Sequence, residues 1–490
     1  MLYSMLAASA SRLPNQPAIV SLAETTTYRQ LLHTVDAFAV RLEEQQLQAG
    51  DPIVVILPNG PEFAVAVFAC AKLGCIAIPL NPSFQETELE HYLNNSAAET
   101  VITGATIAAK HRHTIHAINS RCRIIVDPLK NENTVGSGDS ASDHFTGDFL
   151  FQYSSGTTGE PKKIVRKQSA LAQEASQYAQ TLSLSQDDRV LAVVPMSHSY
   201  GFGNCLMAAI CAGATLYTLE NFNRRRVMDT LIEKRITVFP GVPFMFSVLA
   251  ESPSLGEMHF PDLRLVYSAG APLDRNTFEA FQDKFHVPVR QHYGSTETGP
   301  AAINLESTEG DLWASVGKSV KNVTIKIIRH DGQPAATGEV GDVVIYSATT
   351  AETQGIPTEA DQQRSADGGF YTGDLGRLDA EGNLFVTGRE SLFINVGGNK
   401  VNPSEVESIL QKHTGVSESL VVGTESAHGQ EFVKAIVVCE AGLTEDDLKA
   451  WCKGKIADFK IPRIIEFRDK LPRTALGKVQ RSAVQEPPAG

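Results

Sequence analysis

The sequence predicts an α/β fold, with a large N-terminal body of several subdomains on parallel-type sheets and a small α+β C-terminal domain. Short apolar runs such as PIVVIL (52–57) and CIAIPL (75–80) alternate with helix-period segments, as expected for parallel strands buried on both faces. The 490 residues, 42% of them hydrophobic, exceed the roughly 100 to 200 residues of one domain. The pattern also changes near residue 390, which indicates a second domain.

The elements of the large body follow in a regular order. The first residues, MLYSMLAASASRL, have no basic segment ahead of their apolar run, so we expect a short amphipathic helix rather than a signal peptide. The later runs VLAVVP, TLYTL, TVFPG and LRLVYSAG predict further buried strands separated by helices. Residues 128–147 are polar, rich in turn formers and without periodicity, and we expect them to connect two subdomains.

The chain after Arg389 predicts a compact mixed unit. PSEVESILQKH begins with Pro403 and Ser404, a helix start, and TEDDLKAWCKGKI begins with Thr444, a good N-cap. The runs SLVVG and FVKAIVVCE predict strands. We therefore expect a large domain over residues 1–389 and a small domain over 390–490.

Charge and cysteine content exclude several classes. The net charge of -13 argues against nucleic-acid binding, which needs a basic face. Ten basic and three acidic residues lie between Lys449 and Arg481, and this basic stretch is either a solvated face or a docking surface for a polyanion. No apolar stretch approaches the roughly 18 to 20 residues of a membrane span. The seven cysteines form no CxxC pair, so we expect a reducing cytoplasmic location without disulfides or zinc.

The strongest local signal is DFLFQYSSGTTGEPKK, residues 148–163. A buried strand leads into a loop of hydroxyls and glycines that ends in Pro161 and Lys162. Hydroxyls and unhindered backbone amides suit polyphosphate oxygens, and the lysine adds compensating charge. The loop does not fit the Walker A spacing G-x-x-x-x-G-K-[ST]. The residues that we assign to the phosphates are Ser154, Ser155, Gly156, Thr157, Thr158, Gly159 and Lys162.

Five motifs in order make the chain similar to the AMP-forming adenylating enzymes. This superfamily includes acyl- and aryl-CoA ligases, firefly luciferase and the adenylation domains of peptide synthetases. The motifs are SSGTTGEPK (154–162), YGSTETG (293–299), YTGDLG (371–376), GRESLFINVGGNKVNPSEVE (388–407) and LPRTALGKVQR (471–481). The resemblance spans residues from about 20 to 481.

The resemblance implies roles in nucleotide binding. It places Tyr293 against adenine, the Thr296 hydroxyl on the α-phosphate and Glu297 on magnesium, a cation that prefers carboxylate oxygens. Asp374 resembles the carboxylate that accepts both ribose hydroxyls, and Arg389 the arginine that also holds the ribose. The other positions assigned to ATP or AMP are Gly270, Ala271, Pro272 and Gly294.

The resemblance also implies a catalytic lysine and a moving domain. Lys478 is expected to neutralise charge on the α-phosphate as a carboxylate attacks it. The family rotates its small domain before the thiol step, about a hinge that corresponds to Ser391, where many relatives have Lys or Asp. Gly398 resembles the glycine that lets a pantetheine arm pass. Gln168 stands where many relatives have histidine, and we interpret this departure as drift in surface contacts.

The acid pocket is expected around PMSHSYGFGN (195–204) and FPGVPF (239–244). Amino-acid-activating relatives have an aspartate at the position of Ser199, so an α-amino acid, whose buried ammonium would lack a counter-ion, is disfavoured. His198 is expected to orient the carboxylate, although it could instead satisfy a hydrogen bond of the core. Small side chains leave room for an aromatic or medium-chain acid. The remaining pocket residues are Tyr200, Gly201, Pro240, Gly241, Ser268 and Ala301.

The resemblance implies a reaction in two steps. A carboxylate and MgATP give acyl-AMP and pyrophosphate, and the thiol of CoA then displaces AMP to form a thioester. An alternative acceptor is the phosphopantetheine arm of a separate carrier protein supplied in trans, and the basic stretch fits CoA phosphates or such a carrier. A nucleotide sensor without turnover is a third reading. The joint presence of Lys162, Glu297, Asp374 and Lys478 argues against it.

Overall fold

A computed structural model describes residues 1–84, 86–119, 122–129, 147–154, 162–252, 259–353, 368–389, 394–396, 399–425, 431–439, 442–456, 458–473, 479, 481 and 484. These residues group into two compact units. The first holds the described residues of Met1–Gly156, Glu160–Ile325 and Ile345–Phe370, and the second those of Lys326–Val344 and Tyr371–Gly490. The domain boundary that the sequence predicts near residue 390 stays a prediction.

A nine-stranded sheet forms the larger half of the first unit. Its central strands run parallel, and antiparallel pairs close both edges. In spatial order the strands are β15 (Lys318–Ser319), β14 (Gly299–Ile303), β13 (Val289–Ser295), β12 (Leu265–Ser268), β11 (Val238–Gly241), β9 (Arg189–Ala192), β10 (Thr215–Thr218), β1 (Pro17–Val20) and β2 (Thr25–Thr27). The four apolar runs predicted as buried strands are thus β9 to β12, and the prediction of a parallel sheet is confirmed.

A seven-stranded sheet forms the other half of the first unit. Five of its strands are parallel, and β7, β8 and β18 form an antiparallel edge. Its order is β18 (Glu352–Thr353), β8 (Lys162–Lys167), β7 (Asp148–Ser154), β4 (Ile76–Pro79), β3 (Pro52–Ile56), β5 (Thr100–Thr103) and β6 (Arg123–Val126). The predicted subdomain connection falls mostly on residues 130–146, outside the described part of the chain.

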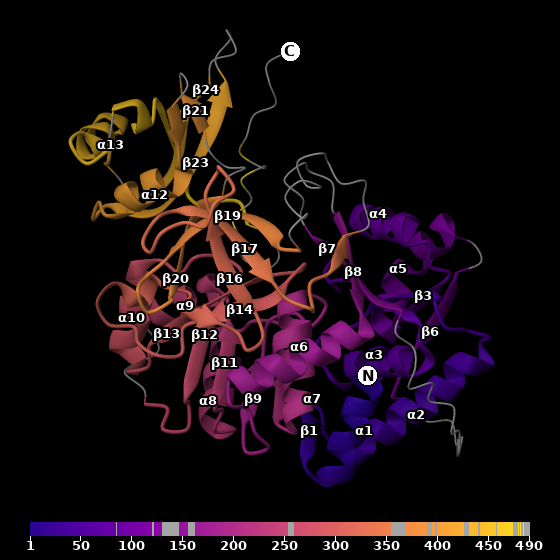
Figure 1. Cartoon of the computed structure of the whole chain (residues 1–490). Coiled ribbons are helices and arrows are strands. Elements are labelled where there is room, and N and C mark those ends of the chain that lie inside the picture. Colours follow the sequence, from indigo (N-terminus) through magenta and orange to yellow (C-terminus); the bar gives the residue numbers. More distant parts are fainter. Residues whose placement is uncertain are drawn as a thin grey trace. The chain divides into compact units, whose positions relative to one another are not determined.

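Helices separate most of the parallel strands of the first unit, as the alternating pattern predicts (Figure 1). Helix α3 is buried on almost every side, in keeping with its apolar sequence PEFAVAVFACAKL. The helices are α1 (Leu2–Arg12), α2 (Tyr28–Glu44), α3 (Pro61–Leu73), α4 (Glu86–Ser96), α5 (Ala105–Ile118), α6 (Gln168–Thr181), the π-helix η1 (Tyr200–Met207), α7 (Ala208–Ala212), α8 (Arg224–Glu233), α9 (Pro243–Ala250), α10 (Arg275–Phe285) and the 3-10 helix η2 (Gly310–Ala314).

The amphipathic first helix is confirmed as α1, whose Leu2 and Leu6 are fully buried. One prediction in this region is wrong. Gln168, interpreted as a surface position, is 1% exposed. Its side-chain oxygen accepts from the Leu2 amide at 3.0 Å, and its side-chain nitrogen donates to the Ala71 carbonyl at 3.0 Å. An amide offers both donor and acceptor, so Gln168 joins α1, α3 and α6 inside the unit.

The second unit combines two sheets, a hairpin and short helices. A four-stranded sheet of β16 (Thr324–Ile328), β17 (Gly341–Tyr346), β19 (Phe370–Leu378) and β20 (Leu384–Arg389) lies mostly within it. The pair β21 (Ile394–Val396) and β22 (Asn399–Val401) precedes a three-stranded sheet of β23 (Val416–Glu425), β24 (Glu431–Cys439) and β25 (Ile464–Phe467). The 3-10 helix η4 spans Asp458–Lys460.

Helices α12 (Pro403–Gln411) and α13 (Glu445–Cys452) lie beside the three-stranded sheet (Figure 1). Both helix starts occur where the sequence predicts them. Pro403 opens α12, and Thr444 caps α13 through a capping box with Asp447. Val406, Leu410, Val433 and Leu448 form part of one apolar core between helices and sheet.

Membrane-spanning helices and disulfide bonds are both absent among the described residues. No described helix combines the length and apolar character needed to cross a membrane. The seven cysteines all lie in the described part of the chain, and each is a free thiol.

Candidate active site

The site is built on β13 and β14, which carry the YGSTETG motif. The two strands are antiparallel, with Tyr293 opposite Ala302 and Ser295 opposite Gly299. Gly294 must be glycine, because a Cβ there would lie 2.3 Å from the Gly299 carbonyl oxygen. The turn between the strands presents the side chains of Thr296 and Glu297, both partly exposed.

Hydrogen bonds fix the shape of this turn. The Ser295 amide donates to the Thr298 hydroxyl at 3.3 Å, and the Thr298 amide donates to the Ser295 hydroxyl at 3.2 Å. From a distant segment, the Ala351 amide donates to the Glu297 carbonyl at 2.6 Å. A turn whose main chain is held from both sides keeps its polar side chains in one place.

The predicted acid segment meets the predicted nucleotide motif at this turn. The hydroxyls of Ser199 and Thr296 are 3.2 Å apart, within hydrogen-bond distance. The next residue, Tyr200, begins η1, and π-helical turns occur frequently at functional sites. Its hydroxyl donates to the Gly241 carbonyl at 3.1 Å. Two segments that lie about a hundred residues apart in the chain therefore lie together at one candidate site.

The parallel strands supply the rest of this candidate site at their carboxyl ends. Gly241 ends β11 and pairs in register with Ser268, which ends β12. Gly270, Ala271 and Pro272 follow directly, with Gly270 at a positive φ of 85°. In open α/β sheets this end of the strands is where ligands bind. Pro240, on β11, and Ala301, on β14, are both buried.

His198 is neutral in the folded protein. Burial lowers its pKa to about 4, while part of the residue keeps accessible surface. A neutral imidazole can donate one hydrogen bond and accept another, so it can orient a carboxylate without adding a full charge. Gly201 lies close to the preceding turn, and a Cβ there would be 2.2 Å from the Pro195 carbonyl oxygen.

An aromatic cluster behind Tyr200 was not predicted. The rings of Tyr200 and His292 stack with centroids 5.8 Å apart, and Tyr267 lies 6.2 Å from Tyr200. Burial lowers the pKa of His292 to about 3, so this ring is neutral as well. A single buried histidine resembles a core residue, and no local spacing in β13 distinguished it.

The predicted ribose residues come together in the second unit. Strands β19 and β20 place Asp374 and Arg389 directly opposite each other. Arg389 Nε donates to Asp374 Oδ1 at 2.6 Å. The Asp374 amide donates to the Thr372 hydroxyl, which in turn donates to the Val343 carbonyl at 3.0 Å. The sheet therefore presents a carboxylate and a guanidinium side by side.

Several predicted residues fall outside the described part of the chain. They are Ser155, Gly156, Thr157, Thr158 and Gly159 of the phosphate loop, Ser391, Gly398 and Lys478. For Ser154 and Lys162 the backbone is described, and they pair across β7 and β8. The roles of all these residues stay predictions.

The fold and the site geometry define an α/β protein with a candidate ligand site at the carboxyl ends of its parallel strands. Comparison with family models shows that the chain belongs to the AMP-binding enzyme family. The AMP-binding enzyme model matches residues 6–353, and the model of the AMP-binding enzyme C-terminal domain matches residues 405–478. The predicted resemblance to the adenylating superfamily is thereby confirmed.

Curated relatives match along nearly the whole chain. Long-chain-fatty-acid–CoA ligase FadD13 of Mycobacterium tuberculosis (strain ATCC 25618 / H37Rv) is 28% identical over 94% of this chain and 92% of its own length. Indoleacetate–CoA ligase of Aromatoleum aromaticum is 29% identical over 96% of this chain and 95% of its own.

Solved structures match as well. ATP-bound MatB from Rhodopseudomonas palustris has a TM-score of 0.88 at 26% identity, covering 99% of this chain and 98% of that one. The o-succinylbenzoate CoA synthetase MenE from Bacillus subtilis, in complex with its acyl-adenylate intermediate, has a TM-score of 0.85 at 26% identity, with the same coverage.

Proposed function

We propose that this protein is an AMP-forming acid–thiol ligase that converts a carboxylic acid and ATP into acyl-AMP and then into an acyl- or aryl-CoA. The observation that carries the proposal is the 3.2 Å contact between the hydroxyls of Ser199 and Thr296. This contact brings the segment proposed to bind the acid next to the motif proposed to bind the α-phosphate. Attack of the carboxylate on the α-phosphate requires the two to be close together. CoA-ligase relatives that match nearly the full chain support it.

Roles in nucleotide binding are proposed for residues of each unit. The Thr296 hydroxyl would contact the α-phosphate, and Asp374 with Arg389 would hold the ribose. The partly exposed carboxylate of Glu297 fits Mg²⁺, because hard cations prefer carboxylate oxygens. When bound, the ion neutralises charge on the phosphate oxygens. Lys478 is proposed to stabilise the charge that develops during the attack.

The acid is proposed to lie beside His198 and Tyr200. Neutral His198 orients the carboxylate by a hydrogen bond, so the acid keeps its own negative charge for the attack. The Tyr200 ring offers a flat wall, anchored by its hydroxyl to the Gly241 carbonyl. An aromatic face favours an aryl acid over a medium-chain acyl acid.

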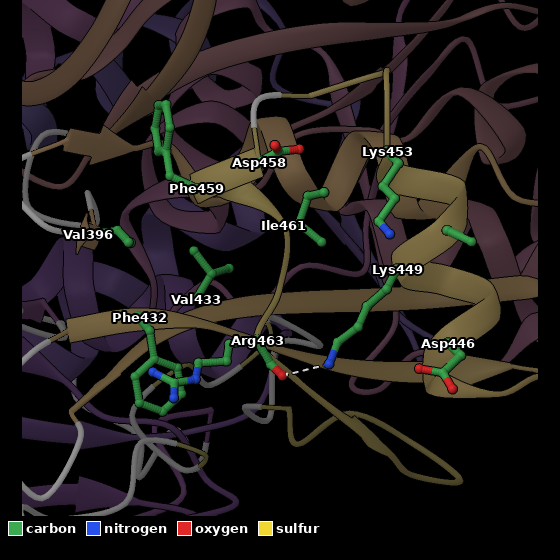
Figure 2. A pocket seen from close by; sticks show the side chains of 11 residues that line it. Val396, Phe432, Val433, Asp446, Lys449, Lys453, Asp458, Phe459, Ile461 and Arg463 are labelled. Atoms are coloured by element: carbon green, nitrogen blue, oxygen red, sulfur yellow. Dashed lines mark hydrogen bonds between the residues drawn. The ribbon is translucent and has the colours of Figure 1, made fainter.

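CoA is the proposed acceptor. A cavity of about 690 Å³ in the second unit opens along the basic stretch. Figure 2 shows Lys449, on α13, and Lys453, directly after α13, on one side of it and Phe459 and Val396 on the other. The Lys449 ammonium donates to the Arg463 carbonyl at 2.8 Å. The lining residues are Val396, Phe432, Val433, Asp446, Lys449, Ala450, Lys453, Asp458, Phe459, Ile461 and Arg463. Aromatic and cationic side chains in a concave site suit a base and its phosphates.

The proposal is tested by acid-dependent release of pyrophosphate from MgATP. The panel covers benzoates, cinnamates, C4 to C12 fatty acids and amino acids, each with CoA, with a phosphopantetheinylated carrier protein, or with neither. We expect an aryl or medium-chain acid to start release, CoA to accelerate it, and an acyl-CoA to form. Turnover with the carrier alone would overturn CoA as acceptor, and silence with every acid would overturn the proposed function.

A further inference from the structure

A buried arginine contacts the turn that carries Thr296 and Glu297, and it lies outside every motif used in the sequence analysis. Arg166, on β8, is 2% exposed. Its Nη1 donates to the Thr296 carbonyl at 3.0 Å, and its Nη2 donates to the Thr349 carbonyl at 3.0 Å. Nη2 also pairs with the carboxylate of Glu174 on α6. One guanidinium thus joins three segments that are far apart in the chain.

The Glu174 carboxylate is enclosed by main chain. A Cβ added at Gly299 would lie 2.1 Å from one of its oxygens, and a Cβ at Gly203 would lie 2.7 Å from the other. Gly299 begins β14 directly after the turn, and Gly203 lies in η1. The ion pair therefore fits closely against both segments that form the proposed site.

The same arginine supports the second residue of the turn. The Glu297 carbonyl accepts from the Ala351 amide at 2.6 Å. Ala351 lies between Thr349, which Arg166 holds, and β18, which pairs with β8 at Val165 and Ile164. The carbonyls of Thr296 and Glu297 are consequently both anchored, the first by Arg166 itself and the second by a segment that Arg166 fixes.

Stability alone does not explain a buried charge pair. Desolvating an arginine and a glutamate is expensive, and well-packed apolar residues often replace such pairs at little cost to stability. A guanidinium offers donors in a fixed planar fork, which apolar residues cannot supply. Arg166 therefore serves to hold the carbonyl groups of Thr296 and Thr349 in place.

We propose that Arg166, supported by Glu174, is a positioning residue for adenylation that fixes the main chain under Thr296 and Glu297. This inference rests on the proposed function, in which those two side chains contact the α-phosphate and Mg²⁺. Without the guanidinium the turn shifts away from the phosphate, and a displacement of about 1 Å can cost a hundredfold in rate.

The test uses the double variant Arg166→Met/Glu174→Met, which removes both charges and retains apolar bulk. We expect a melting temperature close to that of the wild type, a KM and a calorimetric Kd for ATP raised about tenfold or more, and a lower kcat for adenylation. Arg166→Lys, which keeps a cation beside Glu174 without the planar fork, should show a smaller increase in both constants.

Arg41→Met is the matched control. Arg41 also donates to two carbonyls in the same unit, those of Val126 and Asp127, away from the turn. It should leave the KM and Kd for ATP unchanged. If Arg166 has only a structural role, the folded double variant should bind ATP as tightly as the wild type does. This result would overturn the proposal. If the wild type activates no acid, the proposed function fails, while the ATP affinities still decide whether Arg166 positions the turn.

Discussion

Each unit contains an arginine–carboxylate pair at or beside its candidate site residues, and the two pairs differ in burial. In the first unit the side chains of Arg166 and Glu174 are 1% and 6% exposed. In the second unit those of Arg389 and Asp374 are 42% and 10% exposed. An almost fully buried pair can contact only protein groups, whereas a pair with an accessible guanidinium can exchange partners with a ligand. The comparison separates a fixed support from a binding group.

The largest effect is expected at Lys478, which is proposed to act in adenylation and not in thioester formation. Lys478→Ala should depress adenylation by about a hundredfold or more, because charge on the α-phosphate then goes uncompensated. Thioester formation from supplied acyl-AMP should stay largely intact. Both half-reactions are measured separately, by pyrophosphate exchange and by acyl-CoA release. An equal loss in both would contradict the assignment.

The two pairs should respond differently to the loss of their arginine. Arg166→Met leaves Glu174 buried and unpaired, and it should lower the free energy of unfolding by about 3 to 5 kcal/mol. Arg389→Met removes a partly exposed partner and should cost about 1 kcal/mol or less. Urea unfolding of both variants gives the comparison. Similar losses in the two would show that burial does not distinguish the pairs.

Asp374→Asn probes the binding side of the comparison. An amide of the same shape keeps the backbone contacts but weakens acceptance from two ribose hydroxyls. Because hydrogen bonds to charged groups contribute about 1.5 to 3 kcal/mol, the KM for ATP should rise by about tenfold or more. The melting temperature should change little. An unchanged KM with a large drop in melting temperature would assign Asp374 a structural role.

The cavity of the second unit should affect CoA and leave ATP unaffected. Lys453→Glu places a negative charge in its lining, and the KM for CoA should rise several-fold, with a smaller difference at high salt. Lys412→Glu, at an exposed position after α12, is the control with the same change of charge. Equal effects of the two variants on CoA would mean that overall charge, rather than the cavity, is responsible.

Two histidines with lowered pKa values, His198 and His292, should make the first unit acid-labile, the smallest of the expected effects. Burial lowers the pKa of His198 from 6.5 to about 4, so between these values the unfolded chain binds more protons than the folded chain. The contribution of neutral His198 to the free energy of unfolding is therefore fully present above about pH 6.5, and it is lost as the pH falls from 6.5 towards about 4. His198→Gln should reduce the difference between the melting temperatures at pH 7 and pH 5. His33→Gln, at an exposed position, should leave that difference unchanged.

Local patterns predict most of the fold and part of the site. Continuous apolar runs predict β9 to β12, since a strand buried on both faces needs no polar side, and Thr444 and Pro403 mark helix starts through backbone chemistry alone. Arg166 and Gln168 are different. Their partners are far along the chain, at Thr296 and Thr349 and at Leu2 and Ala71. Such contacts follow from tertiary packing, so sequence spacing could not reveal them.

The most direct test of the account is a single turnover followed by mass spectrometry. Enzyme, MgATP and an accepted acid are mixed without CoA, and CoA is added later. The account predicts that acyl-AMP and pyrophosphate accumulate first and that CoA then converts the intermediate to acyl-CoA and AMP. Formation of ADP and phosphate, or of acyl-CoA without a preceding acyl-AMP, would contradict it.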